Sequence, residues 1–121
     1  VLGYLADPYG VMESHPGRTE ILSRVTVTGF DRCVTEIDDL QIVDVRSPGE
    51  VTLGAIDNSV RIPVGQLPER IGELDPTKPT IVYCAGGYRS AVAASLLVTR
   101  GFDDVSDLIG GYGAWALAHI G

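Results

Sequence analysis

The chain has 121 residues, 45% hydrophobic and 21% charged, a balance typical of one globular domain that buries its own core. Its formal net charge of −7 argues against nucleic acid and against an anionic membrane as partners, because few cations are present to neutralise phosphates. No apolar run approaches the roughly 20 residues that cross a bilayer, and residues 1–10 lack the basic start and long apolar core of a signal peptide.

The N-terminal part of the chain differs in composition from the rest. Residues 12–18 are polar and contain a Pro-Gly pair, which is typical of a linker. Residues 1–11 have few apolar partners elsewhere in the sequence and are consistent with the remnant of a preceding domain. We therefore expect residues 1–20 to be an N-terminal segment or linker, and residues 21–121 to form the domain.

Apolar periodicity divides this domain into short strands and helices. A strand at 24–27 precedes a helix, which is predicted from apolar residues at i, i+3, i+4 and i+7 (Phe30, Cys33, Val34 and Ile37) with Thr28 as its cap. A second strand at 41–45 ends before Ser47-Pro48. The remaining elements are expected as a strand at 60–62, a helix at 64–74, a strand at 80–84, a helix at 88–100, a strand at 105–108 and a last helix opened by Gly110-Gly111.

The alternation of strands with helices predicts the architecture. Strands joined through helices require right-handed crossovers, which place neighbouring strands parallel and helices on both faces. The expected fold class is therefore α/β, with a mainly parallel five-stranded sheet flanked by helices on both faces.

Cysteine and histidine usage bears on the cellular compartment and on metals. Cys33 and Cys84 could form one disulfide, but a domain of this size has little need of one, and a reactive thiol fits a reducing compartment such as the cytoplasm. His15 and His119 are both isolated from cysteine, which does not favour a structural zinc site. We expect neither a metal nor a cofactor.

The most informative stretch is residues 80–95, T-I-V-Y-C-A-G-G-Y-R-S-A-V-A-A-S. An apolar β-branched strand ends in Cys84, a Gly-Gly pair follows, and an alanine-rich helix begins. Open α/β sheets bind ligands at the carboxyl ends of their strands. The backbone N–H groups of this loop and of the first helical turn would converge on the sulfur, favouring a thiolate and any anion attached to it.

The residue types in this loop suit a cysteine nucleophile. A free thiol has a pKa of about 8.5 and must be helped to ionise; the helix N-terminus supplies roughly half a positive charge and Arg89 a whole one. Tyr88 is expected at the rim, and Ser90 is expected to cap the helix or to donate a hydrogen bond. No histidine adjoins Cys84 in sequence, so ionisation would rest on the loop unless a base approaches in space. The simpler alternative is a buried, inert cysteine beside a tight turn, which the Gly-Gly-x-Arg continuation disfavours.

At these residues the chain resembles the rhodanese-like sulfurtransferase domain. Residues 84–90, C-A-G-G-Y-R-S, look like the six-residue active loop of that family, and Asp44-Val45-Arg46 with Glu50 looks like its upstream signature. The stretches 54–63 and 110–115 also fit, so that the likeness runs from about residue 25 to residue 118. One departure is that Ala55 and Asp57 stand where the family commonly has histidine and proline.

The resemblance implies a function and a set of site residues. Cys84 would take a sulfane sulfur from a small anionic donor, thiosulfate or a low-molecular-weight persulfide, and would pass it as a persulfide to a thiol or other nucleophile. The persulfide and donor would be bound by Ala85, Gly86, Gly87, Tyr88, Arg89 and Ser90. Residues 1–5, V-L-G-Y-L, also resemble the end of another rhodanese-like unit, as in fusions with a metallo-β-lactamase-fold persulfide dioxygenase. We therefore expect a fused or partner persulfide-handling domain.

Two other functions remain open on the sequence. A non-catalytic rhodanese-fold recognition module would keep the fold for partner binding, although such modules often lose the nucleophile that is present here. A cysteine phosphatase or arsenate reductase has a similar loop, but five residues separate its cysteine from its arginine, whereas four separate Cys84 from Arg89.

Several residues outside the loop carry weaker expectations. Asp44 is expected to brace the loop, and Arg46 is expected to pair with Glu50, with an ordinary surface ion pair as the plainer alternative. The other expectations are that Cys33, Tyr112 and Trp115 pack in or against the core, that His119 is a solvated tail residue, and that Asp103 and Asp104 face water.

Overall fold

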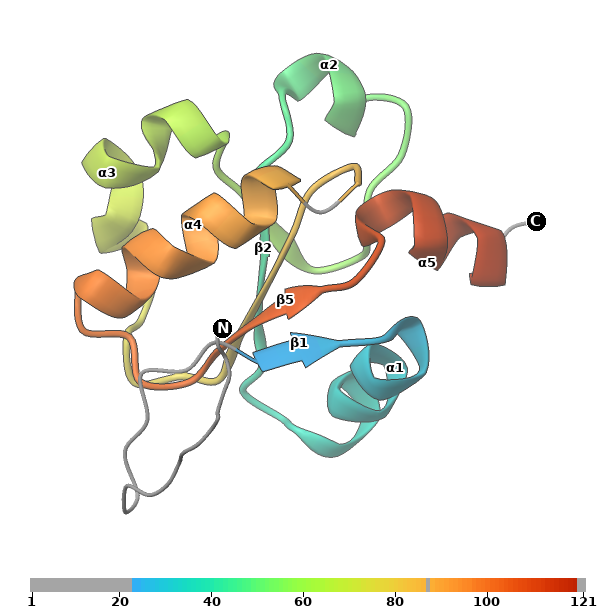
Figure 1. The fold of residues 1–121 in the computed structure, drawn as a ribbon, viewed down its shortest axis with the longest axis horizontal. Coiled ribbons are helices and arrows are strands. Elements are labelled where there is room, and N and C mark those ends of the chain that lie inside the picture. The colour runs from blue at the N-terminus through green and yellow to red at the C-terminus, as the bar shows by residue number, and fades with distance from the viewer. Residues whose placement is uncertain (1–22, 87, 120–121) are drawn as a thin grey trace.

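The computed structural model describes residues 23–86 and 88–119, and the expectations for residues 1–20 lie outside this range. A five-stranded sheet crosses the molecule in the order β1-β5-β4-β2-β3, and every pairing is parallel (Figure 1). This confirms the α/β architecture. The strands are β1 (Ser23–Val25), β2 (Gln41–Asp44), β3 (Ser59–Arg61), β4 (Thr80–Tyr83) and β5 (Val105–Leu108).

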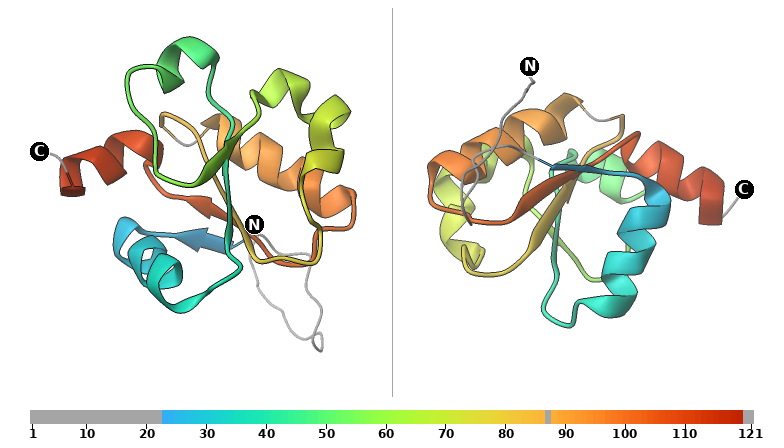
Figure 2. Two further views of the ribbon diagram at one scale, coloured as in Figure 1. Left: turned by 180° about the vertical axis from the view of Figure 1, so that it is seen from behind. Right: turned by 60° about the horizontal axis from the view of Figure 1, so that its bottom comes forward.

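Helices cover both faces of the sheet (Figure 2). On one face, a cluster that includes Val43, Val82 and Leu97 packs beneath α3 and α4; on the other, a cluster that includes Phe30 and Tyr83 packs against α1 and α5. The helices are α1 (Val27–Glu36), α2 (Pro48–Val51), α3 (Leu67–Arg70), α4 (Tyr88–Thr99) and α5 (Gly111–His119), with single 3₁₀ turns η1 (Val64–Gln66) and η2 (Ile71–Glu73) on either side of α3. None of the described helices is long and apolar enough to cross a bilayer.

Several element bounds, such as those of β1 and β3, differ from expectation by one or two residues. Two differences have clear local reasons. The cap of α1 is Thr26 and not Thr28, because the extended backbone of Thr26 lets its Oγ accept from the Gly29 N–H at 3.1 Å. The helix expected over 64–74 is split into three pieces, and Pro68 in the first turn of α3 has no N–H to continue the preceding ladder. Leu67 and Leu74 of this segment are buried.

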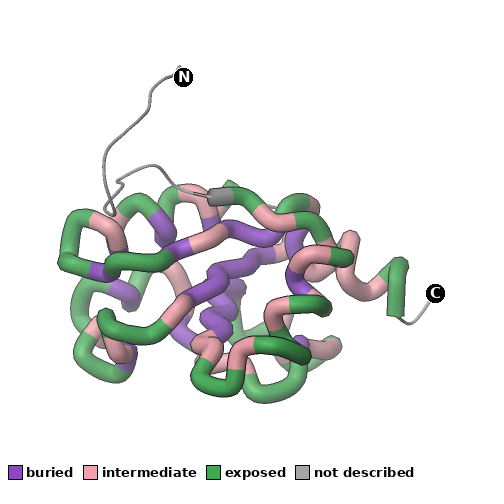
Figure 3. The backbone as a smooth tube through the Cα atoms, turned by 90° about the horizontal axis from the view of Figure 1, so that it is seen from below, coloured by how far each residue is buried: buried purple, intermediate pink, exposed green. Residues whose placement is uncertain are grey.

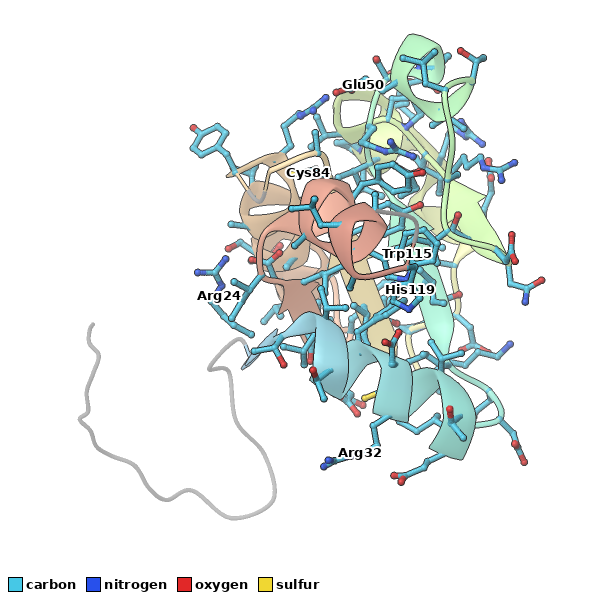
Figure 4. The ribbon with its side chains drawn as sticks, turned by 90° about the vertical axis from the view of Figure 1, so that its right-hand side faces the viewer. Arg24, Arg32, Glu50, Cys84, Trp115 and His119 are labelled. Atoms are coloured by element: carbon cyan, nitrogen blue, oxygen red, sulfur yellow. The ribbon has the colours of Figure 1, made fainter. Side chains whose placement is uncertain are left out.

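Helix α2 was not expected and follows β2 almost at once. Ser47 and Glu50 form a capping box: Ser47 Oγ accepts from the Glu50 N–H, and the Ser47 N–H donates to Glu50 Oε1 at 2.9 Å. The box fixes Glu50 above the carboxyl end of the sheet, near the loop that follows β4 (Figure 4).

Strand β4 occupies the middle of the sheet. All four of its residues are buried, and it lies between β5 and β2, so its carboxyl end lies midway along the row of strand ends. Buried segments run through the centre of the molecule, while exposed segments lie on its outside (Figure 3). The residue that follows β4 is Cys84.

Candidate active site

Cys84 lies at the carboxyl end of β4 with only 1% of its surface exposed. The loop after it leads to α4, whose first residue, Tyr88, is 81% exposed. Neither Cys84 nor Cys33 forms a disulfide, and Cys33 packs half-buried against the Phe30 cluster, as predicted. Cys84 is therefore buried beneath the surface of the protein.

The start of α5 holds the first two peptide groups of this loop. The Tyr112 N–H donates to the Cys84 carbonyl at 2.7 Å, and the Gly113 N–H donates to the Ala85 carbonyl at 3.2 Å. In a trans peptide the C=O and the following N–H point in opposite directions, and no described peptide bond is cis. With both carbonyls turned toward α5, the N–H groups of Ala85 and Gly86 point away from it.

Gly111 makes this close approach possible. Its φ is +59°, a conformation that side chains disfavour, and a Cβ at this position would lie 2.8 Å from the Ala85 carbonyl oxygen and closer still to that of Cys84. The sequence marked Gly110-Gly111 only as a helix start. Its further role is to let a helix backbone touch the loop backbone.

Asp44 and Arg46 form a buried pair, which corrects the expectation that Arg46 pairs with Glu50. Arg46 donates to the Asp44 carboxylate from Nε at 3.0 Å and from Nη2 at 2.8 Å, and the two side chains are 4% and 0% exposed. Two residues apart along extended chain, they point to the same side, and a carboxylate this buried requires a cation beside it. Burial acts to lower the pKa of Arg46, but the hydrogen bond and charge of Asp44 raise it overall.

This pair reaches the loop through two tyrosines. The Tyr83 hydroxyl donates to Asp44 at 2.7 Å, and Tyr83 is the residue immediately before Cys84. The guanidinium of Arg46 lies over the ring of Tyr112, 4.3 Å from its centroid, and Tyr112 is the residue whose N–H binds the Cys84 carbonyl. Burial raises the pKa of Tyr83. Asp44 and Arg46 thus contact both residues that fix the Cys84 backbone.

Glu50 pairs with Arg89 instead of Arg46. Two parallel hydrogen bonds of 2.8 and 2.9 Å join the guanidinium to the carboxylate, and both side chains are about one-third exposed. The Arg89 hydrogen bond lowers the pKa of Glu50 to about 2, and Glu50 raises the pKa of Arg89, to which the charge of Cys84 also contributes. Arg89 therefore interacts electrostatically with Cys84, but the Glu50 carboxylate neutralises part of its charge. The sequence did not predict this pairing.

A third acidic residue, Asp107, is linked to the sulfur through Ser90, and sequence reasoning missed it. Cys84 Sγ is 3.6 Å from Ser90 Oγ, and Ser90 Oγ donates to Asp107 Oδ1 at 2.6 Å. Asp107 is on β5, 3% exposed, and its other oxygen lies 3.3 Å from Arg24 of β1. The sequence carried little signal for this residue, because β5 reads V-S-D-L and mixes polar with apolar residues.

The remaining expectations concern α5 and the periphery. Tyr112 and Trp115 pack against the core as expected, and Asp103 and Asp104 are exposed. His119 is exposed, as expected, but it also has partners: its ring stacks on Trp115 at 4.4 Å, and its Nε2 lies 3.1 Å from Asp31 of α1 (Figure 4). Among the described residues no cluster of His, Cys, Asp or Glu could hold a metal ion; His15 lies outside that range.

Comparison with known proteins places this geometry in a family. The model of the rhodanese-like domain matches residues 31–118. A sulfurtransferase of Allochromatium vinosum is 32% identical over 96 residues, covering 79% of this chain and 90% of the relative, and the thiosulfate sulfurtransferase GlpE of Shewanella oneidensis is 39% identical over 82 residues, covering 68% and 81%. The crystal structure of a rhodanese-related protein from Thermoplasma volcanium superposes with a TM-score of 0.73 at 30% identity, covering 80% of this chain and 93% of that one. The family match spans strands β2 to β5, the Cys84 loop and α5 as far as residue 118, and the chain belongs to the rhodanese-like domain family.

Proposed function

We propose that this protein is a sulfurtransferase in which Cys84 carries a sulfane sulfur as a persulfide. The observation that carries the proposal is the setting of Cys84, a buried thiol at the centre of the sheet edge whose next two peptide groups are turned by α5. The relatives support it, since they include proteins named sulfurtransferase and thiosulfate sulfurtransferase.

The reaction needs a sulfur nucleophile and little proton transfer. The Cys84 thiolate attacks the outer sulfur of thiosulfate, the S–S bond of the donor breaks, and its electron pair leaves with sulfite. An acceptor thiolate then attacks the outer sulfur of the persulfide, and the electron pair of that S–S bond returns to the Cys84 sulfur. A low-molecular-weight persulfide would donate in the same way, with a thiolate as its leaving group.

The chain's own groups would bind and orient the sulfur. Peptide N–H groups are donors suited to an anion, and those of Ala85 and Gly86 are oriented by the α5 contacts. Arg89 would attract the anionic donor, and Asp44 and Arg46 would hold the loop in place through Tyr83 and Tyr112. Because four residues separate Cys84 from Arg89, the ring suits one sulfur atom better than a phosphate group.

The test is a donor panel of thiosulfate, 3-mercaptopyruvate and glutathione persulfide, assayed side by side with a thiol acceptor. We expect turnover with thiosulfate or the persulfide, loss of turnover in Cys84→Ser, and full turnover in Cys33→Ser, which changes the other cysteine. Turnover that persists in folded Cys84→Ser would refute the assignment. A folded wild-type protein that is inactive toward every donor would favour the non-catalytic module, and hydrolysis of an aryl phosphate that depends on Cys84 would favour the phosphatase.

A further inference from the structure

Three buried polar side chains form a line that starts at the reactive sulfur. Cys84 Sγ, Ser90 Oγ and Asp107 Oδ1 follow one another at 3.6 and 2.6 Å, and the three residues are 1%, 0% and 3% exposed. They come from the loop after β4, the first turn of α4, and β5. Little water can reach this line to exchange its hydrogen bonds.

The direction of each hydrogen bond in the line is determined by the carboxylate. An ionised carboxylate can only accept, and a serine hydroxyl has a single proton to donate. At 2.6 Å that proton points to Asp107. Ser90 Oγ therefore has only lone pairs to offer to the sulfur, which is favourable when Cys84 is a thiol that donates and unfavourable when it is a thiolate.

We propose that Asp107 is a positioning residue that acts through Ser90 to hold Cys84 as a thiol at rest, and so sets the pH at which the sulfur becomes nucleophilic. This inference rests on the proposed function to the extent that Cys84 is the nucleophile of the reaction. The sequence analysis assigned ionisation of Cys84 to the loop unless another group approaches in space, and Asp107 is such a group.

Other charges act on the same sulfur and oppose or moderate this effect. Arg89 of α4 is coupled to Cys84 and favours the thiolate, although Glu50 of α2 shares its charge. Arg24 of β1 lies 3.3 Å from Asp107 Oδ2 and offsets part of the Asp107 charge. Asp44 of β2 is paired with Arg46. The Ser90–Asp107 pair differs from these groups because it acts by the direction of a hydrogen bond at the sulfur, and only indirectly by charge.

Asp107→Asn is the decisive change because it keeps the shape of the side chain. An amide can turn its NH₂ group toward Ser90 Oγ, and the hydroxyl is then able to donate to the Cys84 sulfur. The measurement is the rate at which iodoacetamide alkylates the Cys84 peptide as a function of pH, quantified by mass spectrometry. We expect the pH midpoint of alkylation to fall by about one unit or more, which is a tenfold gain in thiolate at a fixed lower pH.

A matched control and a double variant separate the mechanism from plain electrostatics. Arg24→Gln breaks the same ion pair as Asp107→Asn without touching Ser90, and its midpoint should not fall. Ser90→Ala should lower the midpoint by less than Asp107→Asn, because it removes the misdirected acceptor and adds no donor. In the Ser90→Ala background, Asp107→Asn should change the alkylation midpoint little, because Asp107 acts on Cys84 through the Ser90 hydroxyl, which is then absent.

The proposal is overturned if the midpoint in Asp107→Asn stays or rises, or if the fall is equally large in the Ser90→Ala background. Thermal unfolding establishes that each variant is folded; if Asp107→Asn does not fold, an unchanged midpoint in Ser90→Ala alone overturns the proposal. Alkylation does not require sulfur transfer. The predicted shifts in a protein that transfers no sulfur would therefore refute the proposed function and leave this inference standing, while normal transfer with unchanged midpoints would do the reverse.

Discussion

Replacing Gly111 by alanine tests whether α5 fixes the Cys84 loop. A side chain at φ +59° costs about 1–2 kcal/mol by itself. The new Cβ would also press on the carbonyl oxygens of Cys84 and Ala85, which are backbone atoms that cannot turn aside, and would strain the Tyr112–Cys84 hydrogen bond, worth about 1 kcal/mol. We expect the free energy of unfolding to fall by about 2–4 kcal/mol in total.

For a domain of this size such a loss lowers the unfolding temperature by roughly 10 °C or more. Calorimetry measures it, and alkylation of Cys84 at neutral pH reports whether the loop has moved. Gly113→Ala is the matched control on the same helix: its Cβ would lie at an ordinary 3.5 Å from the Ala85 oxygen, and alanine favours a helix, so stability should hold or rise. Wild-type stability and wild-type Cys84 reactivity in Gly111→Ala would refute the role given to α5.

Three further substitutions test the charged and polar supports of the site. Glu50→Gln should lower the free energy of unfolding by under about 1 kcal/mol at neutral pH, because the pair with Arg89 is one-third exposed and screened by solvent. Folding lowers the pKa of Glu50 from 4.5 to about 2. In urea unfolding, the wild-type protein should therefore be more stable than the variant above pH 4.5, and this difference should disappear as the pH falls through 2. Tyr83→Phe should lower stability by about 1–3 kcal/mol, because it removes the hydroxyl that donates to buried Asp44, and an unchanged unfolding midpoint would contradict this. Arg46→Lys should weaken both stability and sulfur transfer, since an ammonium cannot reproduce the two-nitrogen contact; a variant equal to wild type in both assays would show that the fork geometry is unimportant.

Much of the fold could be predicted because its signals are local. β5 has the expected bounds, Val105–Leu108, and β4 and α4 each end one residue before the expected end. Buried parallel strands appear in the sequence as short apolar runs. The longer apolar stretch of α4 lies between two short strands, β4 and β5, and is recognisable as a buried helix. Helix α2 was not predicted because four residues are too few to show helical periodicity, although the Ser47-x-x-Glu50 capping box is a sequence signal for a helix start.

The partners of the charged side chains could not be predicted in the same way. From the sequence, Arg46 could pair with either Asp44 or Glu50. In the structure, Arg46 pairs with Asp44 because α2 places Glu50 beside Arg89 of α4, which is far away in the sequence. Asp107 could be linked to Cys84 only once the register of β5 beside β4 was known. Sequence reasoning therefore singled out Cys84 and its loop, and the structure supplied the side chains that contact them.

The account's central claim is that Cys84 carries one sulfur atom, and the mass of the protein after reaction with thiosulfate tests it most directly. We predict a gain of one sulfur atom, located on the Cys84 peptide, released by a thiol acceptor and accompanied by one sulfite for each protein molecule. A folded protein with unchanged mass, or with the added sulfur on the Cys33 peptide, would contradict the account.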